Sequence, residues 1–335
     1  MAPQTGYNCL FSNLCDLSKF YGCALKEYEI FFLANGLFCY YVNEKDRQTK
    51  EIHKNIIIND YQSIVKNYAK EINVQVIVKE NTKALTYLIG LKEAICKDNP
   101  VIILINSKCL TYQTPPAYLT EVDAMHAVIV YGFDDEKKEI YLYDSYVYDQ
   151  MQNPIPYYTV KLSYNVFLEN VYLYSRFDFS HYKKLDKTYK ANRVLSRLHC
   201  FIKDNSHKGL TKGIEAFRNC IMDIKLLKGI NREEAKKEFN ELFYLFKVQF
   251  SFVNHYILEY MHDSDMEDTL KKMIINRIKI LIKDWDKYLM KMLVGSYMDN
   301  NRVIDRIIES GLQLANKQQD LITEVIGSQY ERINR

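Results

Sequence analysis

The sequence predicts an α+β protein of two domains, a strand-rich domain at residues 1–180 and an all-helical domain at residues 181–335. A chain of 335 residues is long enough for two cores, since domains average roughly 150 residues. Short apolar runs alternate with helical patterns up to about residue 180, and helical periodicity then continues almost to the end. The basic, polar stretch at residues 183–190 lies where the pattern changes, so we predict the domain boundary there.

The first predicted helix begins at Cys9. Asn8 is a residue type that caps helices, and Gly6 before it favours a turn. After the cap, apolar residues recur at spacings of three and four, as on one face of a helix. These residues are Leu10, Phe11, Leu14, Leu17, Phe20 and Tyr21.

The other elements of the first domain follow from the same two periodicities. A polar turn at residues 134–138 separates two strands, which predicts an antiparallel hairpin. Residues 101–105 are continuously apolar, as in a strand buried on both faces. We predict a loop at residues 43–55, helices at 25–33, 61–72, 85–96 and 163–169, and strands at 37–42, 74–78, 101–105, 124–133, 139–144, 157–162 and 171–177.

The second domain is predicted as a helical bundle. Asn231 and Glu234 have the spacing of a capping box at the start of one helix. Long apolar stripes, such as Ile274, Ile278, Leu281, Trp285 and Leu289, fit packing in a bundle. We predict helices at residues 214–227, from 231 onward, at 266–294 and at 302–326.

Composition excludes several classes of function. The 45 basic and 42 acidic residues are mixed along the chain, which argues against nucleic-acid binding. No apolar run approaches the roughly 20 residues that span a bilayer, and no targeting segment begins the chain, so we expect no membrane association. The eight cysteines lack C-x-x-C spacing, which favours free thiols in the cytoplasm. The sequence contains no glycine motif for nucleotide binding. It also has no cysteines and histidines at zinc-ligand spacing, so we expect no metal.

Cys9 has two interpretations. In the first turn of a helix, unpaired amides and the helix dipole favour a thiolate, which is how a cysteine nucleophile is usually prepared. Alternatively, Cys9 is a small apolar residue at a buried helix start, because free cysteine is among the most buried residue types. Cys15 and Cys23 lie in or just after the same helix, away from its N-terminus.

A cysteine nucleophile needs a base, and the base needs a group that orients it. His126 begins one strand of the predicted hairpin and Asp144 ends the other, so we expect their side chains to lie close together. Each residue alone also fits a structural role, His126 as a hydrogen-bonded core histidine and Asp144 as a turn or cap residue. Together, Cys9, His126 and Asp144 have the papain-like order of nucleophile, base and orienting group.

Gln4 is a candidate for the oxyanion hole. An amide donor a few residues before the thiol would help the backbone N–H of Cys9 to bind an oxyanion. The alternative is an exposed and disordered chain end.

Two stretches of the chain contain familiar motifs: Asn8-Cys9, Tyr21-Gly22, Glu27 and Gly36-Leu37-Phe38, then His126-Ala127-Val128, Gly132-Phe133-Asp134-Asp135 and Tyr143-Asp144. They resemble the N-terminal domain of the butirosin-biosynthesis acyltransferase family, which is related to the bacteriocin-processing cysteine peptidases. The helical half, with residues 209–224 near its start, is similar to the family's C-terminal domain. The Ile-, Lys- and Asn-rich composition further suggests the amide-forming branch of closthioamide biosynthesis.

The resemblance implies a papain-like cysteine peptidase-type fold used to form amides in antibiotic biosynthesis. By matching position, Cys9 is the nucleophile, His126 the base and Asp144 its orienting residue. Cys9 would take an acyl group from the phosphopantetheine thioester of an acyl or peptidyl carrier protein, and a small-molecule amine would accept it. The enzyme would need no cofactor of its own, since the carrier protein supplies the phosphopantetheine arm.

Two other functions remain open. One is a cysteine peptidase that processes a peptide. The other is a non-catalytic binding protein on the same fold.

Overall fold

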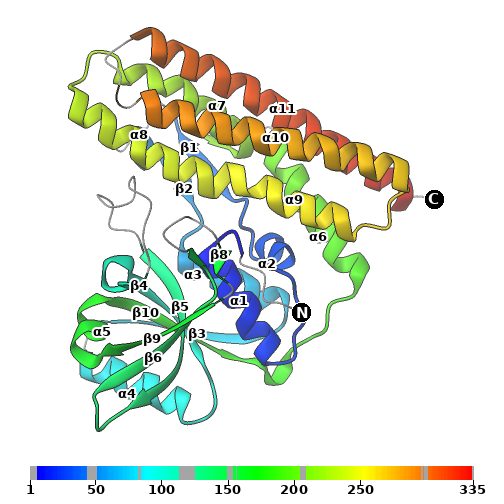
Figure 1. Ribbon diagram of the computed structural model, residues 1–335. Coiled ribbons are helices and arrows are strands. Elements are labelled where there is room, and N and C mark those ends of the chain that lie inside the picture. Colours follow the sequence, from blue (N-terminus) through cyan, green and yellow to red (C-terminus); the bar gives the residue numbers. More distant parts are fainter. Residues whose placement is uncertain are drawn as a thin grey trace. The chain divides into compact units, whose positions relative to one another are not determined.

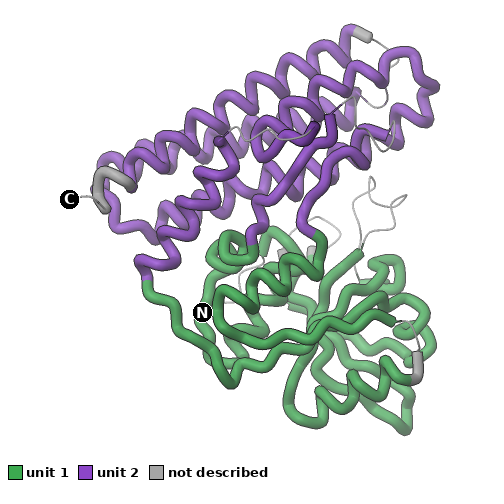
Figure 2. Tube along the Cα trace, turned by 180° about the vertical axis from the view of Figure 1, so that it is seen from behind, with its two compact units in different colours: residues 1–34, 60–186 green, residues 35–59, 187–335 purple. Residues whose placement is uncertain are grey.

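The computed structural model describes residues 6–43, 51–81, 84–112, 125–148, 154–155, 157–203, 209–295, 297 and 301–333. The chain forms two units, each built from two separate segments (Figure 2). Unit 1 contains Met1–Ala34 and Asp60–Asp186, and unit 2 contains Asn35–Asn59 and Lys187–Arg335. The described residues confirm a mixed α and β composition with antiparallel sheets and a helical C-terminal region.

Unit 1 is organised around a six-stranded sheet in which all neighbouring strands are antiparallel (Figure 1). The predicted hairpin is confirmed, with Ile129 opposite Tyr143 and Asp134 opposite Glu139. In spatial order the strands are β3 (Gln75–Glu80), β10 (Val171–Asp178), β4 (Val101–Asn106), β5 (Met125–Asp134), β6 (Glu139–Asp144) and β9 (Tyr158–Ser163).

Helices cover both faces of this sheet. On one face, α4 (Ala84–Ile95) and α5 (Tyr164–Asn170) bury Leu91 and Phe167 against Val128 and Leu142. On the opposite face, α1 (Cys9–Phe20) is tied to β6, because the Tyr143 hydroxyl donates to Asp16 Oδ2 at 3.0 Å. The remaining elements of unit 1 are α2 (Glu27–Leu33), α3 (Tyr61–Glu71), η3 (Ser107–Cys109), η5 (Phe179–His181) and the short pair β7 (Val147–Tyr148) and β8 (Pro154–Ile155).

Unit 2 contains a small three-stranded sheet, which corrects the expectation of an all-helical second domain. The predicted strand at 37–42 exists as β1 (Cys39–Val42), but it pairs with β2 (Ile56–Ile58) and β11 (Leu210–Lys212), which the sequence did not predict. The predicted loop at residues 43–55 also contains a 3₁₀ helix, η2 (Ile52–Asn55).

The helices of unit 2 enclose an aromatic core. Trp285 is fully buried, and its ring centroid lies 5.1 Å from that of Phe217. Gln318 accepts from Trp285 Nε1 at 3.2 Å and donates to the Phe250 carbonyl at 3.2 Å. The helices are α6 (Lys187–Ile202), α7 (Gly213–Asp223), η6 (Ile224–Leu227), α8 (Arg232–Phe246), a π-helical turn (Lys247–Ser251), α9 (Phe252–Asp263), α10 (Asp268–Gly295) and α11 (Asn301–Ile333). Among the described residues, no helix combines the length and apolar character that crossing a membrane requires.

Candidate active site

Cys9 is the first residue of α1, as predicted. The Asn8 side chain caps the helix by accepting from the backbone N–H groups of Leu10 at 2.9 Å and Phe11 at 3.4 Å. Cys9 is partly exposed. Its thiol therefore lies at the positive end of the helix dipole, where a thiolate is favoured.

The turn before Cys9 is held by the Glu27 carboxylate. Oε1 accepts from the backbone N–H groups of Tyr7 at 3.0 Å and Asn8 at 3.2 Å, and Oε2 accepts from Ser12 Oγ at 3.2 Å. Gly6 fits closely against this group, because a Cβ atom there would lie 1.9 Å from both Glu27 Oε2 and Ser12 Oγ. The turn-forming character of Gly6 is visible in the sequence, whereas the role of Glu27 is not.

His126 and Asp144 lie at the same end of the hairpin, and the structure brings their side chains together. His126 Nε2 donates to Asp144 Oδ2 at 2.7 Å, with the two residues 5% and 0% exposed. Two further groups hold the carboxylate: the Tyr112 hydroxyl donates to Oδ2 at 2.9 Å, and the Tyr146 backbone N–H donates to Oδ1 at 2.9 Å. Asp144 is thus fixed on both oxygens.

Cys9 approaches the imidazole of His126 from α1. A hydrogen bond joins their side chains, and Nε2 already faces Asp144, so Nδ1 is the ring nitrogen directed at the thiol. Burial alone would lower the pKa of His126, but the negative charges of Asp144 and Cys9 and the bonds to both raise it to about 10. A charged imidazolium between a carboxylate and a sulfur is the arrangement that activates a cysteine nucleophile.

Other cysteines lack this environment. Cys15, one turn and a half further along α1, donates its S–H to the Leu25 carbonyl at 3.1 Å. Burial raises the pKa of the Cys15 thiol to about 12, and burial likewise raises the pKa of Cys39 to about 12 and that of Cys109 to about 11. These thiols stay protonated at neutral pH.

Gln4, the oxyanion-hole candidate, lies outside the described residues. His53, which the sequence placed in a loop, belongs to η2 and contacts Glu238 through Nδ1 at 2.8 Å and through its backbone N–H at 2.7 Å. Both of these contacts pair His53 with a glutamate, whereas His126 contacts a cysteine.

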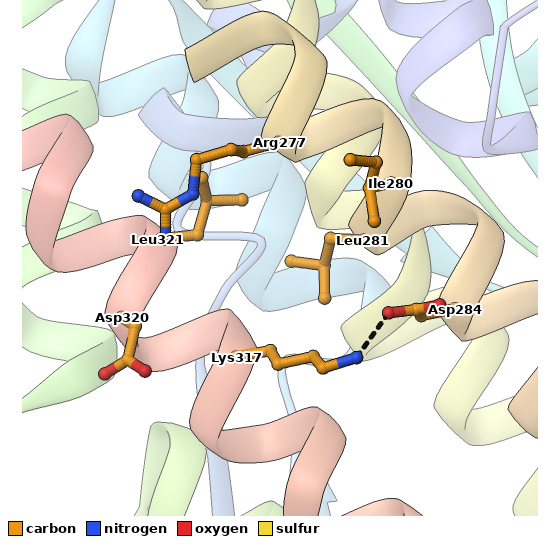
Figure 3. Close-up of a pocket in the computed structure, with 7 residues that line it drawn as sticks. All are labelled: Arg277, Ile280, Leu281, Asp284, Lys317, Asp320 and Leu321. Atoms are coloured by element: carbon orange, nitrogen blue, oxygen red, sulfur yellow. Dashed lines mark hydrogen bonds and ion pairs between the residues drawn. The ribbon is translucent and has the colours of Figure 1, made fainter. Parts of the chain in front are cut away.

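A pocket of about 210 Å³ between α10 and α11 lacks the groups needed for such chemistry (Figure 3). Lys317 donates to Asp284 at 2.7 Å, and Arg277 pairs with Glu324, so its principal cations are already neutralised. None of the residues that line it is a cysteine or histidine: Arg277, Ile280, Leu281, Asp284, Lys317, Asp320 and Leu321.

Cys9 at the start of α1, with His126 and Asp144 at neighbouring ends of β5 and β6, forms a candidate active site with a cysteine nucleophile. Residues 8–145 match the family model described as Butirosin biosynthesis protein H, N-terminal, and this range contains Cys9, His126 and Asp144. The match confirms the predicted resemblance to this family over residues 8–145. No curated protein matches the chain. Placement in the closthioamide branch stays a prediction.

Proposed function

We propose that the protein is an acyltransferase of antibiotic biosynthesis that forms an amide through an acyl group on Cys9. The observation that carries this proposal is the position of His126, bonded on one side to Asp144 and on the other to a thiol at a helix N-terminus. The family match over residues 8–145 supports the biosynthetic setting. The antiparallel sheet and N-terminal helix of unit 1 support a papain-like catalytic domain within residues 1–180, without Asn35–Asn59, which belong to unit 2. A helical domain in residues 181–335 follows it.

In the first half-reaction, the Cys9 thiolate attacks the carbonyl carbon of an acyl thioester on the phosphopantetheine arm of a carrier protein. The new C–S bond moves an electron pair onto the carbonyl oxygen, where the backbone N–H of Cys9, with Gln4 as a second donor, would stabilise it. Collapse of this intermediate breaks the bond to the phosphopantetheine sulfur. That sulfur leaves as a thiol with the proton of His126.

In the second half-reaction, a small-molecule amine attacks the acyl group on Cys9. Neutral His126 takes the proton that the amine loses as the C–N bond forms. Cys9 leaves as a thiolate beside the imidazolium that this proton transfer has formed, so the starting ion pair is restored. Asp144 keeps the ring oriented and stabilises its charged form in both halves.

A product assay tests this function against its two alternatives. The purified protein is incubated with a carrier protein bearing an acyl thioester and with a panel of primary amines. Amide product that depends on Cys9 is expected. Free acid alone, or cleavage of a peptide, would favour a cysteine peptidase, and product unchanged in Cys9→Ala would favour a binding protein.

A further inference from the structure

Asn13 links the helix that carries Cys9 to the strand that carries His126. It lies one turn after Cys9 on α1 and is fully buried. Its Nδ2 group donates to the Cys9 carbonyl at 2.8 Å and to the Ala127 carbonyl at 2.8 Å. Ala127 follows His126 directly in β5. One amide group therefore bridges the backbone of Cys9 and the backbone of the residue that directly follows His126.

We propose that Asn13 is a positioning residue, whose Nδ2 group sets the separation between the Cys9 thiol and the His126 imidazole. This inference rests on the roles given above to Cys9 and His126. Both bridged carbonyls belong to unit 1, so the link acts within one compact unit of the chain.

The chemistry of the position requires an amide. Nδ2 carries two hydrogens, and each serves one carbonyl. An aspartate of the same shape has no such donors and would place one carboxylate oxygen against two carbonyl oxygens. A serine would reach the Cys9 carbonyl of its own helix, as serines in helices do, but its single donor would not also serve Ala127.

The other end of the amide adds no bond. Asn13 Oδ1 is buried and has no hydrogen-bond partner among the described residues. A buried acceptor without a partner is costly, so the side chain contributes through its donors alone. The two donated bonds are what the asparagine supplies here.

Asn254 provides a matched control. It is fully buried in α9, its Nδ2 donates to the carbonyls of Phe250 at 3.2 Å and Ser251 at 3.1 Å, and its Oδ1 likewise has no partner among the described residues. Both of its bonds stay within its own helical segment in unit 2. Asn254→Ala thus removes a similar side chain without loosening Cys9 from His126.

The test compares Asn13→Ser, Asn13→Ala and Asn254→Ala in the full-length chain. Two quantities are measured in folded protein: the rate of Cys9 alkylation by iodoacetamide at pH 7, and the titration of the His126 ring by NMR. Alkylation in both Asn13 variants is expected to slow between about 10- and 100-fold, because small displacements of reacting groups have effects of that size. The His126 titration is expected to move to lower pH, since Cys9 then contributes less to holding its proton.

Asn254→Ala is expected to lower the unfolding temperature and leave both quantities as in the wild type. Asn13→Ser preserves the local bond and tests the bridge if Asn13→Ala does not fold. A wild-type alkylation rate and His126 titration in folded Asn13→Ser would overturn the proposal. Failure of the wild type to accept an acyl group would instead contradict the proposed function, and the effect of Asn13 on the Cys9–His126 pair would still be measurable.

Discussion

Asp144 holds the imidazole of His126 through an Nε2 to Oδ2 bond of 2.7 Å, and both side chains are buried. Burial disfavours the charged ring and so lowers the pKa of His126. The Asp144 carboxylate and the Cys9 sulfur outweigh this effect and raise the pKa to about 10. The protonation of His126 is therefore controlled by its two neighbours.

Asp144→Asn is expected to lower the pKa of His126, because it removes the larger of the two charges that favour the imidazolium. Amide formation is expected to fall on the order of 10²–10⁴-fold, as for other bases that lose their orienting carboxylate. NMR titration of the His126 ring measures the first effect. A titration at the wild-type pH would contradict this account of the pair.

Stability is expected to decrease as the pH rises. The pKa of His126 is higher in the folded protein than its unperturbed value near 6.5, so the folded state binds this proton more tightly than the unfolded chain. The resulting stabilisation is complete below about pH 6.5 and disappears as the pH passes about 10. Urea unfolding of the wild type and of His126→Gln at pH 6 and at pH 10 checks this. If the two proteins differ in free energy of unfolding by the same amount at pH 6 and at pH 10, the account is wrong.

Tyr112→Phe is expected to weaken the site without dismantling it. Burial and the charge of Asp144 raise the pKa of Tyr112, so its phenol stays protonated and donates to Asp144 Oδ2. Phenylalanine would keep the stacking on Tyr158, at a centroid distance of 4.7 Å, and lose only this bond. We expect activity to decrease on the order of tenfold, since a bond to a charged group contributes about 1.5–3 kcal/mol. Tyr158→Phe is the control, and equal rates for the two variants would argue against a role for the Tyr112 hydroxyl.

Much of the site can be predicted because its signals are local. Asn8 caps the helix by binding N–H groups two and three residues further along, and the β5–β6 hairpin closes over a short polar turn. Local capping and a local hairpin were enough to place Cys9 at a helix start and His126 near Asp144.

The supporting residues could not be predicted because their contacts are distant in sequence. Asn13 reaches Ala127 across 114 positions, Tyr112 reaches Asp144 across 32, and Glu27 reaches Tyr7 across 20. The same holds for the pairing of Val42 with Leu210 in the small sheet of unit 2. No periodicity in the chain encodes these partners, since each depends on how the elements pack.

Gly6→Ala is expected to destabilise the turn that precedes Cys9. The added methyl would overlap Glu27 Oε2 and Ser12 Oγ, so the carboxylate that holds the turn must move. We expect the free energy of unfolding to fall by about 1–3 kcal/mol and Cys9 alkylation to slow. Gly327→Ala in α11 is the control, because a Cβ there meets no atom within 4 Å, and it is expected to stabilise the helix by up to about 1 kcal/mol. Equal unfolding midpoints for the two variants would contradict the assigned role of Gly6.

The central claim is that Cys9 carries the acyl group, and intact-protein mass spectrometry tests it most directly. The wild type, Cys9→Ala and Cys15→Ala are each mixed with the acyl-loaded carrier protein in the absence of an amine. The wild type and Cys15→Ala are expected to gain the mass of one acyl group, since the Cys15 thiol is buried and its pKa is about 12. Cys9→Ala is expected to gain none. An adduct of equal amount on Cys9→Ala, or no adduct on the wild type, would contradict the account.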